Sequence, residues 1–370
     1  MRTVRLRVTL REVDPRVLRV IDVPETSTLP ELHALLQAAV GWTDSHLHQF
    51  LAGPVRYGVP HEEWDDDQLD EATTRLRDLP DQFVYLYDFG DDWTHDVELL
   101  GPGGDEPGCV YGEGTCPPED CGGPPGYAAL VAVLADPHHD DHERLRDWAG
   151  ELAPFDQAAT DLLVRRTVGE VPPSVRLVLD LLADGVTLTP GGRLPRTAVR
   201  QVQEHRPQWC PLGRPPSLED DLPPLAALRD LMRDVGLLRL AKGVLRPTRA
   251  AADELEVVRR LRSWFPPAEF TSLLASDVVA MLAAAGPQTA NDLAEVLQAG
   301  YSSWSSNGRS LTQEDVVMQM YRLAPVLEAL DLVHVDRRSW RPGPAALTLL
   351  SRATALAQIW TTGRHMIPAR

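Results

Sequence analysis

The chain has 370 residues and a hydrophobic content of 43%, which is enough for two or three domains with cores of their own. No apolar run approaches the ~18 residues of a membrane span, so we expect no association with a membrane. The formal net charge of −18 is divided unevenly, because residues 1–167 hold 33 Asp and Glu against 13 Arg, whereas residues 168–370 hold 21 against 23 Arg and Lys. A half with a net charge of −20 repels nucleic acid, which proteins bind through cations on phosphates. A solvated acidic surface that aids solubility is the simpler interpretation.

The N-terminal segment and the cysteine content predict a cytoplasmic protein. Residues 1–13 alternate basic and apolar side chains and lack the uninterrupted apolar stretch of a secretory signal. Four cysteines without such a signal indicate a reducing compartment. In that compartment a cluster of cysteines is more often a metal site than a set of disulfides.

Strands and a helix are predicted at the start of the chain. Residues 2–10 alternate apolar and polar side chains with the period of a half-buried strand, and residues 17–23 follow as its partner after a turn. Thr28 precedes a helix that Gly41 ends. A further strand is predicted at residues 46–50. The predicted buried face of the helix consists of Leu32, Leu35, Leu36, Ala39 and Val40.

Residues 83–100 have the clearest hairpin pattern in the chain. Two runs rich in aromatic and β-branched residues flank the tip Asp-Phe-Gly-Asp-Asp at residues 88–92. On the second strand, His95 shares the apolar face with Trp93 and Val97. His95 is therefore either a hydrogen-bonded core histidine or a metal ligand or active-site base.

The segment at residues 109–127 is the strongest candidate for metal binding. Three of the four cysteines follow the pattern Cys-x6-Cys-x4-Cys, at Cys109, Cys116 and Cys121. A structural zinc ion takes ligand sets such as three thiolates and one imidazole. Zinc would also offset the ordering entropy of a loop rich in Pro and Gly that has no apolar anchors. Disulfide or redox chemistry, and plain packing of the thiols, are the alternatives. The fourth ligand would come from His95, His138, His142 or Cys210.

Two helices are predicted after the cysteines. The first runs from about residue 126 to 134, and Asp136-Pro137 resembles the N-cap and first residue of the second. The second helix would place His138 and His142 one turn apart on one face, and this spacing can bind zinc. The same spacing also arises by chance on a polar helix face.

An ordered set of short motifs links the first half of the chain to a known family. The motifs are Leu32-His33, Gly41-Trp42, His46-Leu47-His48, YDFGDDWTH at residues 87–95, CPPEDCGG at residues 116–123, Gly126-Tyr127, and Asp136-Pro137-His138 through Trp148. Together they resemble the plasmid pRiA4b ORF-3-like family, also described as insertion-element passenger proteins. The resemblance covers about residues 1–168 and implies a compact α+β domain with a mostly antiparallel sheet and packed helices. The family has no established reaction, so it implies a fold rather than a function.

The second half of the chain contains an internal repeat. Residues 228–247 align without gaps on residues 323–342, at an offset of 95. The matched pairs are Leu237/Leu332, Leu238/Val333, Leu240/Val335, Leu245/Trp340, Arg246/Arg341 and Pro247/Pro342. Each copy predicts a helix followed by a two-stranded wing, with further helices upstream. We therefore expect a mainly α region with two winged-helix-like units, at residues 172–250 (the first repeat) and 267–346 (the second repeat).

The second repeat has few cations where a DNA-reading helix needs them. Its candidate helix at residues 312–323 carries Glu314 and Asp315 against Arg322. The predicted wing is more basic, with Arg337, Arg338 and Arg341, but a net charge of +2 over residues 168–370 is small for a duplex-binding surface. Docking of a protein partner is the favoured interpretation, and DNA binding is the alternative.

An enzymatic function has little support in the sequence. Asp88, Asp91, Asp92 and Asp96 near His95 can bind a hard cation or supply a base, although Asp and Gly also favour plain turns. No GxSxG, P-loop or HExxH motif occurs. We predict a non-enzymatic interaction or regulatory protein, with a DNA-associated regulator as the first alternative. A metal-dependent hydrolase at His95 and the neighbouring aspartates is the second alternative.

Overall fold

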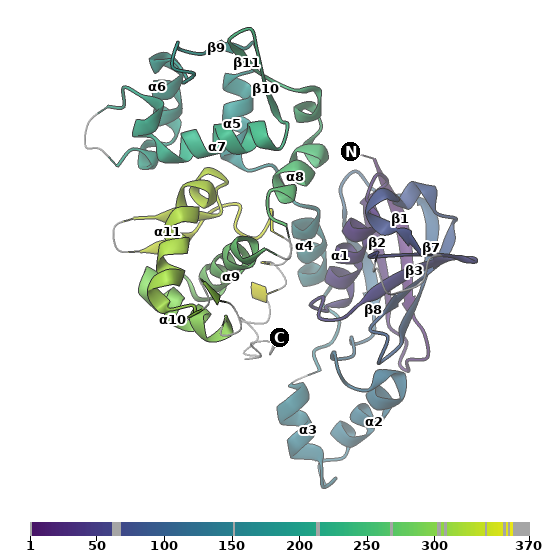
Figure 1. The fold of residues 1–370 in the computed structure, drawn as a ribbon. Coiled ribbons are helices and arrows are strands. Elements are labelled where there is room, and N and C mark those ends of the chain that lie inside the picture. Colours follow the sequence, from purple (N-terminus) through teal and green to yellow (C-terminus); the bar gives the residue numbers. More distant parts are fainter. Residues whose placement is uncertain are drawn as a thin grey trace. The chain divides into compact units, whose positions relative to one another are not determined.

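The computed structural model describes residues 2–60, 68–150, 152–211, 215–266, 269–301, 305–306, 309–336, 339–350, 353 and 356–357. The chain divides into two compact units, Met1–Val168 and Gly169–Arg370. We call them the α+β unit and the helical unit (Figure 1). Among the described residues, no helix has both the length and the apolar character needed to cross a bilayer.

An eight-stranded sheet forms the centre of the α+β unit, in the order β5-β4-β3-β6-β7-β1-β2-β8. All neighbouring strands pair antiparallel except β4 and β5, which confirms the mostly antiparallel α+β class. The strands are β1 (Thr3–Leu10), β2 (Leu18–Pro24), β3 (His48–Ala52), β4 (Val55–Gly58), β5 (Gln68–Asp70), β6 (Gln82–Tyr87), β7 (Trp93–Pro102) and β8 (Gly108–Glu113). The hairpin predicted at residues 83–100 is β6 and β7.

Four helices and two short 3-10 turns accompany the described strands of this unit. They are α1 (Leu29–Val40), η1 (Glu71–Thr73), η2 (Leu76–Asp78), α2 (Gly123–Ala135), α3 (His142–Ala149) and α4 (Gln157–Val168). Helix α1 begins with a capping box between Thr28 and Glu31 and ends at Gly41, whose φ of 103° is left-handed. The five predicted core residues of α1 are all buried. Helices α1 and α4 lie side by side against one face of the sheet (Figure 1).

The helix predicted from Asp136 is present, but it begins later, at His142. Asp136 ends α2, and its carboxylate accepts a hydrogen bond from the backbone N–H of His138 at 2.9 Å. Successive turns then carry the chain to His142, where α3 begins after Asp141. An aspartate that bonds the second residue ahead favours a turn over continued helix. His138 therefore lies in a turn, and the two histidines do not share a helix face.

A buried arginine ties several parts of the α+β unit together. Arg19 on β2 is 3% exposed and donates hydrogen bonds to the carbonyls of Ala39, Leu18, Glu113 and Gly114 at 2.7–3.2 Å. Its guanidinium also stacks on the ring of Phe155, 4.3 Å from the centroid. Burial lowers the pKa of Arg19 below its usual value. The planar, five-donor guanidinium suits this use because it reaches several carbonyls at once.

The helical unit consists mainly of α-helices, which confirms the predicted class. The same order of elements occurs in it twice. In the first repeat the elements are α5 (Pro173–Leu181), β9 (Val186–Thr187), α6 (Arg196–His205), η3 (Pro207–Trp209), η4 (Glu219–Asp221), α7 (Pro223–Asp234), β10 (Leu238–Ala241) and β11 (Val244–Pro247). The connection to the second repeat holds η5 (Arg249–Ala252) and α8 (Glu254–Ser263). In the second repeat they are α9 (Phe270–Ala285), α10 (Ala290–Gly300), β12 (Ser305–Ser306), β13 (Arg309–Ser310), α11 (Gln313–Ala329), β14 (Val333–Val335) and β15 (Trp340–Pro342). Each repeat thus has three helices followed by a two-stranded hairpin.

The offset of 95 residues extends to backbone conformation. Gly236 and Asp331 occupy equivalent positions and both have a positive φ, of 71° and 55°. The next residue donates a hydrogen bond to a helix carbonyl in each copy, Leu237 to Met232 at 2.8 Å and Leu332 to Leu327 at 2.9 Å. Only the first copy has glycine, the usual residue for this conformation.

One hydrophobic core runs through both repeats, from Val171 to Ala357. A buried ion pair also links them. The Asp331 carboxylate, with no exposed surface, binds both terminal nitrogens of Arg206 at 2.9 Å. The same carboxylate accepts the backbone N–H of Ser174 at 2.8 Å. The two repeats therefore form one folded unit rather than two beads on a linker.

Candidate metal centre

Three chain segments that are distant in sequence meet at one end of the sheet in the α+β unit. They follow α1 (residues 42–47), join β6 to β7 (residues 88–92), and precede α2 (residues 116–122). The indole N–H of Trp42 donates to the Pro117 carbonyl at 2.8 Å. The backbone N–H of Gly122 donates to the Asp91 carboxylate at 3.0 Å. Three motifs of the family resemblance thus belong to a single place in the fold.

Tyr87 and Glu119 fix this arrangement from within. The Tyr87 hydroxyl accepts the backbone N–H groups of Ser45 and His46, at 2.9 and 3.3 Å. It donates its own proton to the Glu119 carboxylate, which also accepts the N–H of Thr43. Burial, followed by the nearby Glu119 charge, raises the pKa of Tyr87 well above its usual value, so the phenol keeps the proton that it donates.

His46 lies between two carboxylates in this region. Its Nε2 is 3.5 Å from Asp88 Oδ2 and 3.2 Å from Asp120 Oδ1. The Nε2 atom is buried. It forms no hydrogen bond among the described residues, because its orientation toward both carboxylates is unsuitable. One atom from each of the three side chains lies within 4.8 Å of the other two.

Asp88 is positioned by its own turn. It has a left-handed φ of 57°, and its Oδ1 accepts the backbone N–H groups of Gly90 and Asp91 at 2.9 and 3.3 Å. This leaves Oδ2 facing His46. Asp120 also has a left-handed φ, of 60°, and its side chain is 59% exposed. The Asp88 carboxylate is therefore fixed by backbone hydrogen bonds of its own turn, whereas the Asp120 carboxylate lies on the solvent side of His46.

The spacing of these three atoms suits a divalent ion. An ion with bonds of about 2.1 Å in octahedral geometry holds adjacent ligand atoms roughly 3 Å apart. The separations of 3.2 and 3.5 Å are close to this value. An imidazole nitrogen suits zinc or iron, and carboxylates suit magnesium or manganese, so the mixed set fits a borderline ion such as Mn²⁺ or Zn²⁺.

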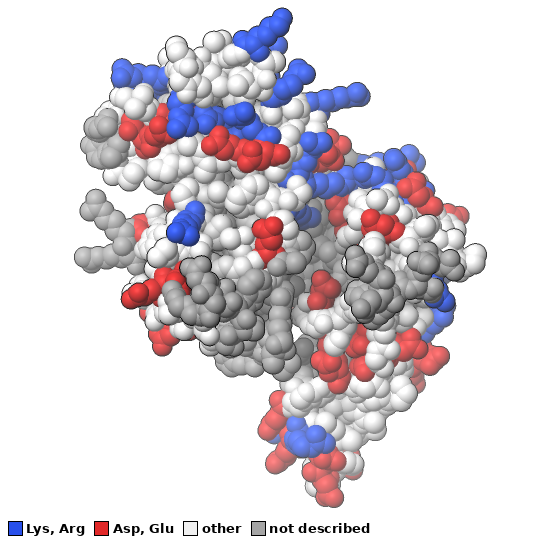
Figure 2. Space-filling model, viewed as in Figure 1, with Lys and Arg blue, Asp and Glu red and all other residues white. Residues whose placement is uncertain are grey.

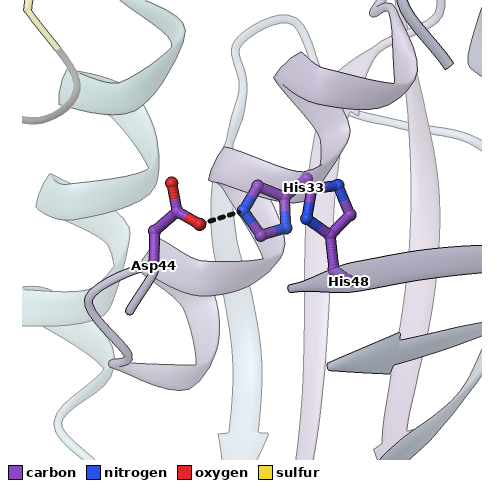
Figure 3. Close-up of side chains that lie close together, drawn as sticks. All are labelled: His33, Asp44 and His48. Atoms are coloured by element: carbon purple, nitrogen blue, oxygen red, sulfur yellow. Dashed lines mark hydrogen bonds and ion pairs between the residues drawn. The ribbon is translucent and has the colours of Figure 1, made fainter. Parts of the chain in front are cut away.

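A second polar group lies beside the first, around His33 of α1. His33 Nε2 is 2.8 Å from the Asp44 carboxylate, and its ring stacks on that of His48 with a centroid distance of 3.5 Å (Figure 3). His48 in turn contacts buried Glu71 at 2.9 Å. The Tyr87 ring lies 6.3 Å from the His33 ring and 5.8 Å from the His46 ring, so it separates the two groups.

Hydrogen bonding assigns the protons of His33. The Gln37 side chain accepts the N–H of Asp44 and donates to the Tyr85 hydroxyl at 2.8 Å. The Tyr85 proton is then directed at His33 Nδ1, 2.7 Å away. The imidazole N–H is at Nε2 and donates to Asp44. Burial lowers the pKa of His33, although Asp44 opposes this effect, and burial raises the pKa of Tyr85 well above its usual value.

The two groups differ in their readiness to hold an ion. Both ring nitrogens of His33 already have partners, and His48 Nε2 pairs with Glu71. An ion there would have to replace those hydrogen bonds. His46 Nε2 has none to lose. The group of His46, Asp88 and Asp120 is therefore the better metal site, and the His33 group is a hydrogen-bonded support beside it.

The predicted zinc ligands lie elsewhere. Among the described residues, two groups of three potential ligands come together, and neither contains a predicted zinc ligand. His95 is fully buried, its Nδ1 bonds the Tyr85 carbonyl at 3.2 Å, and burial lowers its pKa to about 4. His138 is exposed in its turn, and His142 is at the start of α3. Cys210 belongs to the helical unit.

The cysteines differ in their surroundings. Cys109 lies in β8, where burial raises its thiol pKa to about 11, and burial raises that of Cys121 to about 12. Cys116 donates to the Pro117 carbonyl at 3.3 Å. Pro117 and its neighbour Pro118 are buried, so the loop does have apolar anchors. A zinc ion on the cysteines stays a prediction.

The sequence names the residues of the better site without joining them. From the sequence, Asp88 belongs to a possible cation site beside His95, and His46 belongs only to a predicted strand and a motif. The available signal was that His46, Asp88 and Asp120 each belong to a motif of the family resemblance. Their convergence depends on loop positions that no local pattern specifies.

Similarity to known proteins supports the assignment of this unit. Residues 2–163 match the plasmid pRiA4b ORF-3-like protein family. The uncharacterized protein y4hQ of Sinorhizobium fredii (strain NBRC 101917 / NGR234) is 42% identical over 167 residues, which cover 43% of this chain and 86% of that protein. The chain belongs to the pRiA4b ORF-3-like family. All of the matched family region lies within the α+β unit.

A solved structure is also similar to this pRiA4b ORF-3-like protein. It is the crystal structure of a protein of unknown function, MM3350, from Methanosarcina mazei Go1. The two chains are 30% identical, with a TM-score of 0.39, over 42% of this chain and 96% of that one.

Proposed function

We propose that the α+β unit binds a divalent metal ion through His46, Asp88 and Asp120. The observation that carries the proposal is the buried Nε2 of His46, which lies between two carboxylate oxygens and hydrogen-bonds to neither. A buried polar atom without a partner costs free energy unless something binds it. A cation accounts for both the lone nitrogen and the two adjacent negative charges.

The ion would keep open coordination positions. Three protein ligands are fewer than the four to six that zinc or manganese takes, and a closed structural site fills all of them. The Asp120 side chain is 59% exposed, which supports access from solvent. We therefore infer that the ion serves to bind a water molecule or an external ligand.

Two aspartates of the same turn provide a matched test. Asp88→Asn keeps the oxygen that accepts the N–H of Gly90, and Asn tolerates the left-handed φ, so the turn survives while a ligand charge is lost. Asp92→Asn makes the same change at another left-handed aspartate outside the group. Calorimetric titration with MnCl₂ and with ZnCl₂ should show one site per chain. Asp88→Asn should weaken it by about 100-fold or more, beyond the usual loss of an outer-shell partner.

Asp92→Asn should bind the ion as the wild-type chain does, and His46→Gln should weaken binding as Asp88→Asn does. Equal affinities for both asparagine variants, or no stoichiometric binding by the wild type, would contradict the site. Metal analysis of the purified chain before and after chelation tests the cysteines separately, because zinc held by the cysteines would be lost in Cys109→Ser and kept in Asp88→Asn.

For the whole chain, we propose an interaction or regulatory role in which each repeat of the helical unit is winged-helix-like. The order of helices and hairpin supports this. So does the short strand β9, which pairs with β11 of the wing, as the bridge between Gln288 and Trp340 does in the second repeat. Helix–turn–helix units of this kind are docking modules for other macromolecules.

A metal-dependent hydrolase is the second candidate, favoured by the open positions inferred for the ion. Its ion would be held by His46 rather than by the predicted His95. Hydrolysis of model phosphate and carboxylate esters in the presence of Mn²⁺ would test it. Activity present in wild type and Asp92→Asn, and lost in Asp88→Asn, would support this function. No metal-dependent activity in the wild-type chain would count against it.

A further inference from the structure

The two repeats of the helical unit carry opposite charge. Residues 172–250 hold 12 Arg and Lys against 8 Asp and Glu, a net charge of +4. Residues 267–346 hold 5 against 9, a net charge of −4. Figure 2 shows Lys and Arg side chains gathered over the part of the helical unit that contains β9, β10, β11 and α6 in Figure 1. The small average charge of this half of the chain conceals that division.

Many cations of the first repeat are exposed and form no ion pair with the residues that the structure describes. In the second repeat Arg341 pairs with Asp336, whereas Arg337 and Arg338 lie outside the described residues. The first repeat has seven exposed cations that form no ion pair within the described part of the chain. They are Arg196, Arg200, Arg233, Arg239, Lys242, Arg246 and Arg249.

The wing of the first repeat places like charges directly opposite each other. In the antiparallel pair β10–β11, Arg239 is the register partner of Arg246, so both side chains are on one face of the hairpin. Lys242 lies at the turn, where it and Gly243 have φ values of 51° and 78°. Like charges at opposed positions repel and destabilise a hairpin. A polyanion bound on this face would relieve the repulsion.

Helix α6 repeats the pattern. Arg196 and Arg200 are four residues apart, so they lie on the same face of the helix, and both are exposed. Like charges at this spacing also destabilise an isolated helix. Two elements of one repeat therefore each keep an unfavourable pair of exposed arginines.

Helix α7 is poorly suited to reading bases. Its Arg229 is 4% exposed and pairs with buried Glu219, while Asp230 and Asp234 are exposed. The helix begins with Pro223-Pro224, which removes two N–H groups that could bind a phosphate. Contact with base edges is what gives sequence specificity, whereas phosphate contacts give affinity. A polyanion on this repeat would be held without much sequence preference.

We propose that the first repeat binds duplex DNA through its phosphates, by way of hairpin β10–β11 and helix α6, with little sequence preference. DNA supplies about one negative charge per 1.7 Å of helix axis, a density that matches closely spaced, unpaired cations. The second repeat, with its opposite net charge, does not take part in this contact.

Fluorescence anisotropy of the full chain with two labelled 24-base-pair duplexes of unrelated sequence tests this. Binding should be similar for both duplexes, and log K should fall with log[NaCl] by about 0.9 per phosphate contact. The variant Arg239→Gln/Lys242→Asn/Arg246→Gln should lower the magnitude of that slope by up to about 3 and weaken binding at 50 mM NaCl at least about tenfold. Asn is chosen at position 242 because it tolerates the left-handed turn.

A control removes three exposed arginines from the α+β unit, as Arg77→Gln/Arg144→Gln/Arg146→Gln. This control makes an equal change in net charge. It should change the slope of log K against log[NaCl] by less than the value of about 0.9 that one phosphate contact contributes. Because the wing substitutions relieve repulsion, the thermal midpoint should be unchanged or higher, which separates lost binding from lost folding. Equal losses in wing and control variants would overturn the proposal, as would a salt-independent affinity or no binding at 50 mM NaCl. Poly-L-glutamate that competes as well as DNA at equal charge would assign the surface to an acidic protein instead.

Discussion

The two units bury polar groups in different ways. In the α+β unit the buried polar groups include neutral titratable side chains, such as His33, Tyr85 and His95, whose pKa values burial shifts toward the uncharged form. In the helical unit the buried charges are arginine–carboxylate pairs, Arg206 with Asp331 and Arg229 with Glu219. The neutral side chains of the α+β unit can change their charge by gaining or losing a proton, or can bind an ion. The ion pairs of the helical unit join distant segments and serve stability.

The largest expected effect is the loss of the link between the repeats. Asp331→Gly removes the carboxylate but keeps the left-handed backbone, since glycine occupies the equivalent position 236 of the first repeat. Arg206, whose side chain is 14% exposed, would then be a mostly buried charge without its partner. Breaking such a pair costs about 3–5 kcal/mol. Urea denaturation with pulse proteolysis, which resolves the units by fragment mass, should show this loss in the helical unit alone.

A matched control is Arg176→Gln, which removes an exposed ion pair with Glu254 and should cost less than about 1 kcal/mol. A loss for Asp331→Gly no larger than that of Arg176→Gln would show that the buried pair does not hold the repeats together.

Acid should affect the α+β unit by an intermediate amount. Burial lowers the pKa of His95 from 6.5 to about 4. Between these pH values His95 is therefore protonated in the unfolded chain and neutral in the folded unit. The free energy of unfolding should therefore be fully present above pH 6.5 and fall by about 3 kcal/mol as the pH drops to 4. The lowered pKa of His33 acts in the same direction.

The variant His95→Phe should flatten this pH dependence, whereas His142→Phe, at the start of α3, should leave it unchanged. Pulse proteolysis in urea at pH 7, 6 and 5 measures both. A slope in the His95→Phe variant as steep as in the wild type would mean that other groups cause the acid sensitivity.

The smallest of the three effects concerns Arg19, the buried arginine of the α+β unit that has carbonyl partners instead of a carboxylate. Arg19→Lys keeps the charge, but one ammonium cannot reach four carbonyls or stack on Phe155. We expect a loss of about 2 kcal/mol from unsatisfied carbonyls. Arg11→Lys, at an exposed ion pair with Asp96, should cost almost nothing in the same denaturation assay. Similar costs at the two positions would refute a special role for Arg19.

The sequence predicts local structure in both units where local interactions decide it. Alternation gives β1, the run from Thr28 to Gly41 gives α1, and the aromatic strands give the hairpin β6–β7. The offset of 95 residues correctly aligns Leu237 with Leu332, which make equivalent hydrogen bonds. In each case the residues that fix the conformation are neighbours in sequence or share one periodic pattern.

The candidate metal site depends on contacts that are not local. His46 comes near Asp88 because the Asp88 N–H bonds the Leu47 carbonyl, and Asp120 approaches because Pro117 binds the indole of Trp42. No period or spacing encodes those contacts. The start of α3 is also not specified by its local pattern, since successive turns from Asp136 to His142 precede the helix. Cysteine spacing suggested a metal loop, but Cys109 is a strand residue.

The position of β1 has a consequence for how the chain folds. This strand begins at Thr3, yet it lies inside the sheet, with β2 on one side and β7 on the other. During synthesis β1 and β2 can pair early, but the other edge of β1 stays open until residue 102 has been made. Closure over so long a loop slows folding and exposes a strand edge to other chains. The α+β unit should therefore depend on chaperones until β7 has been made.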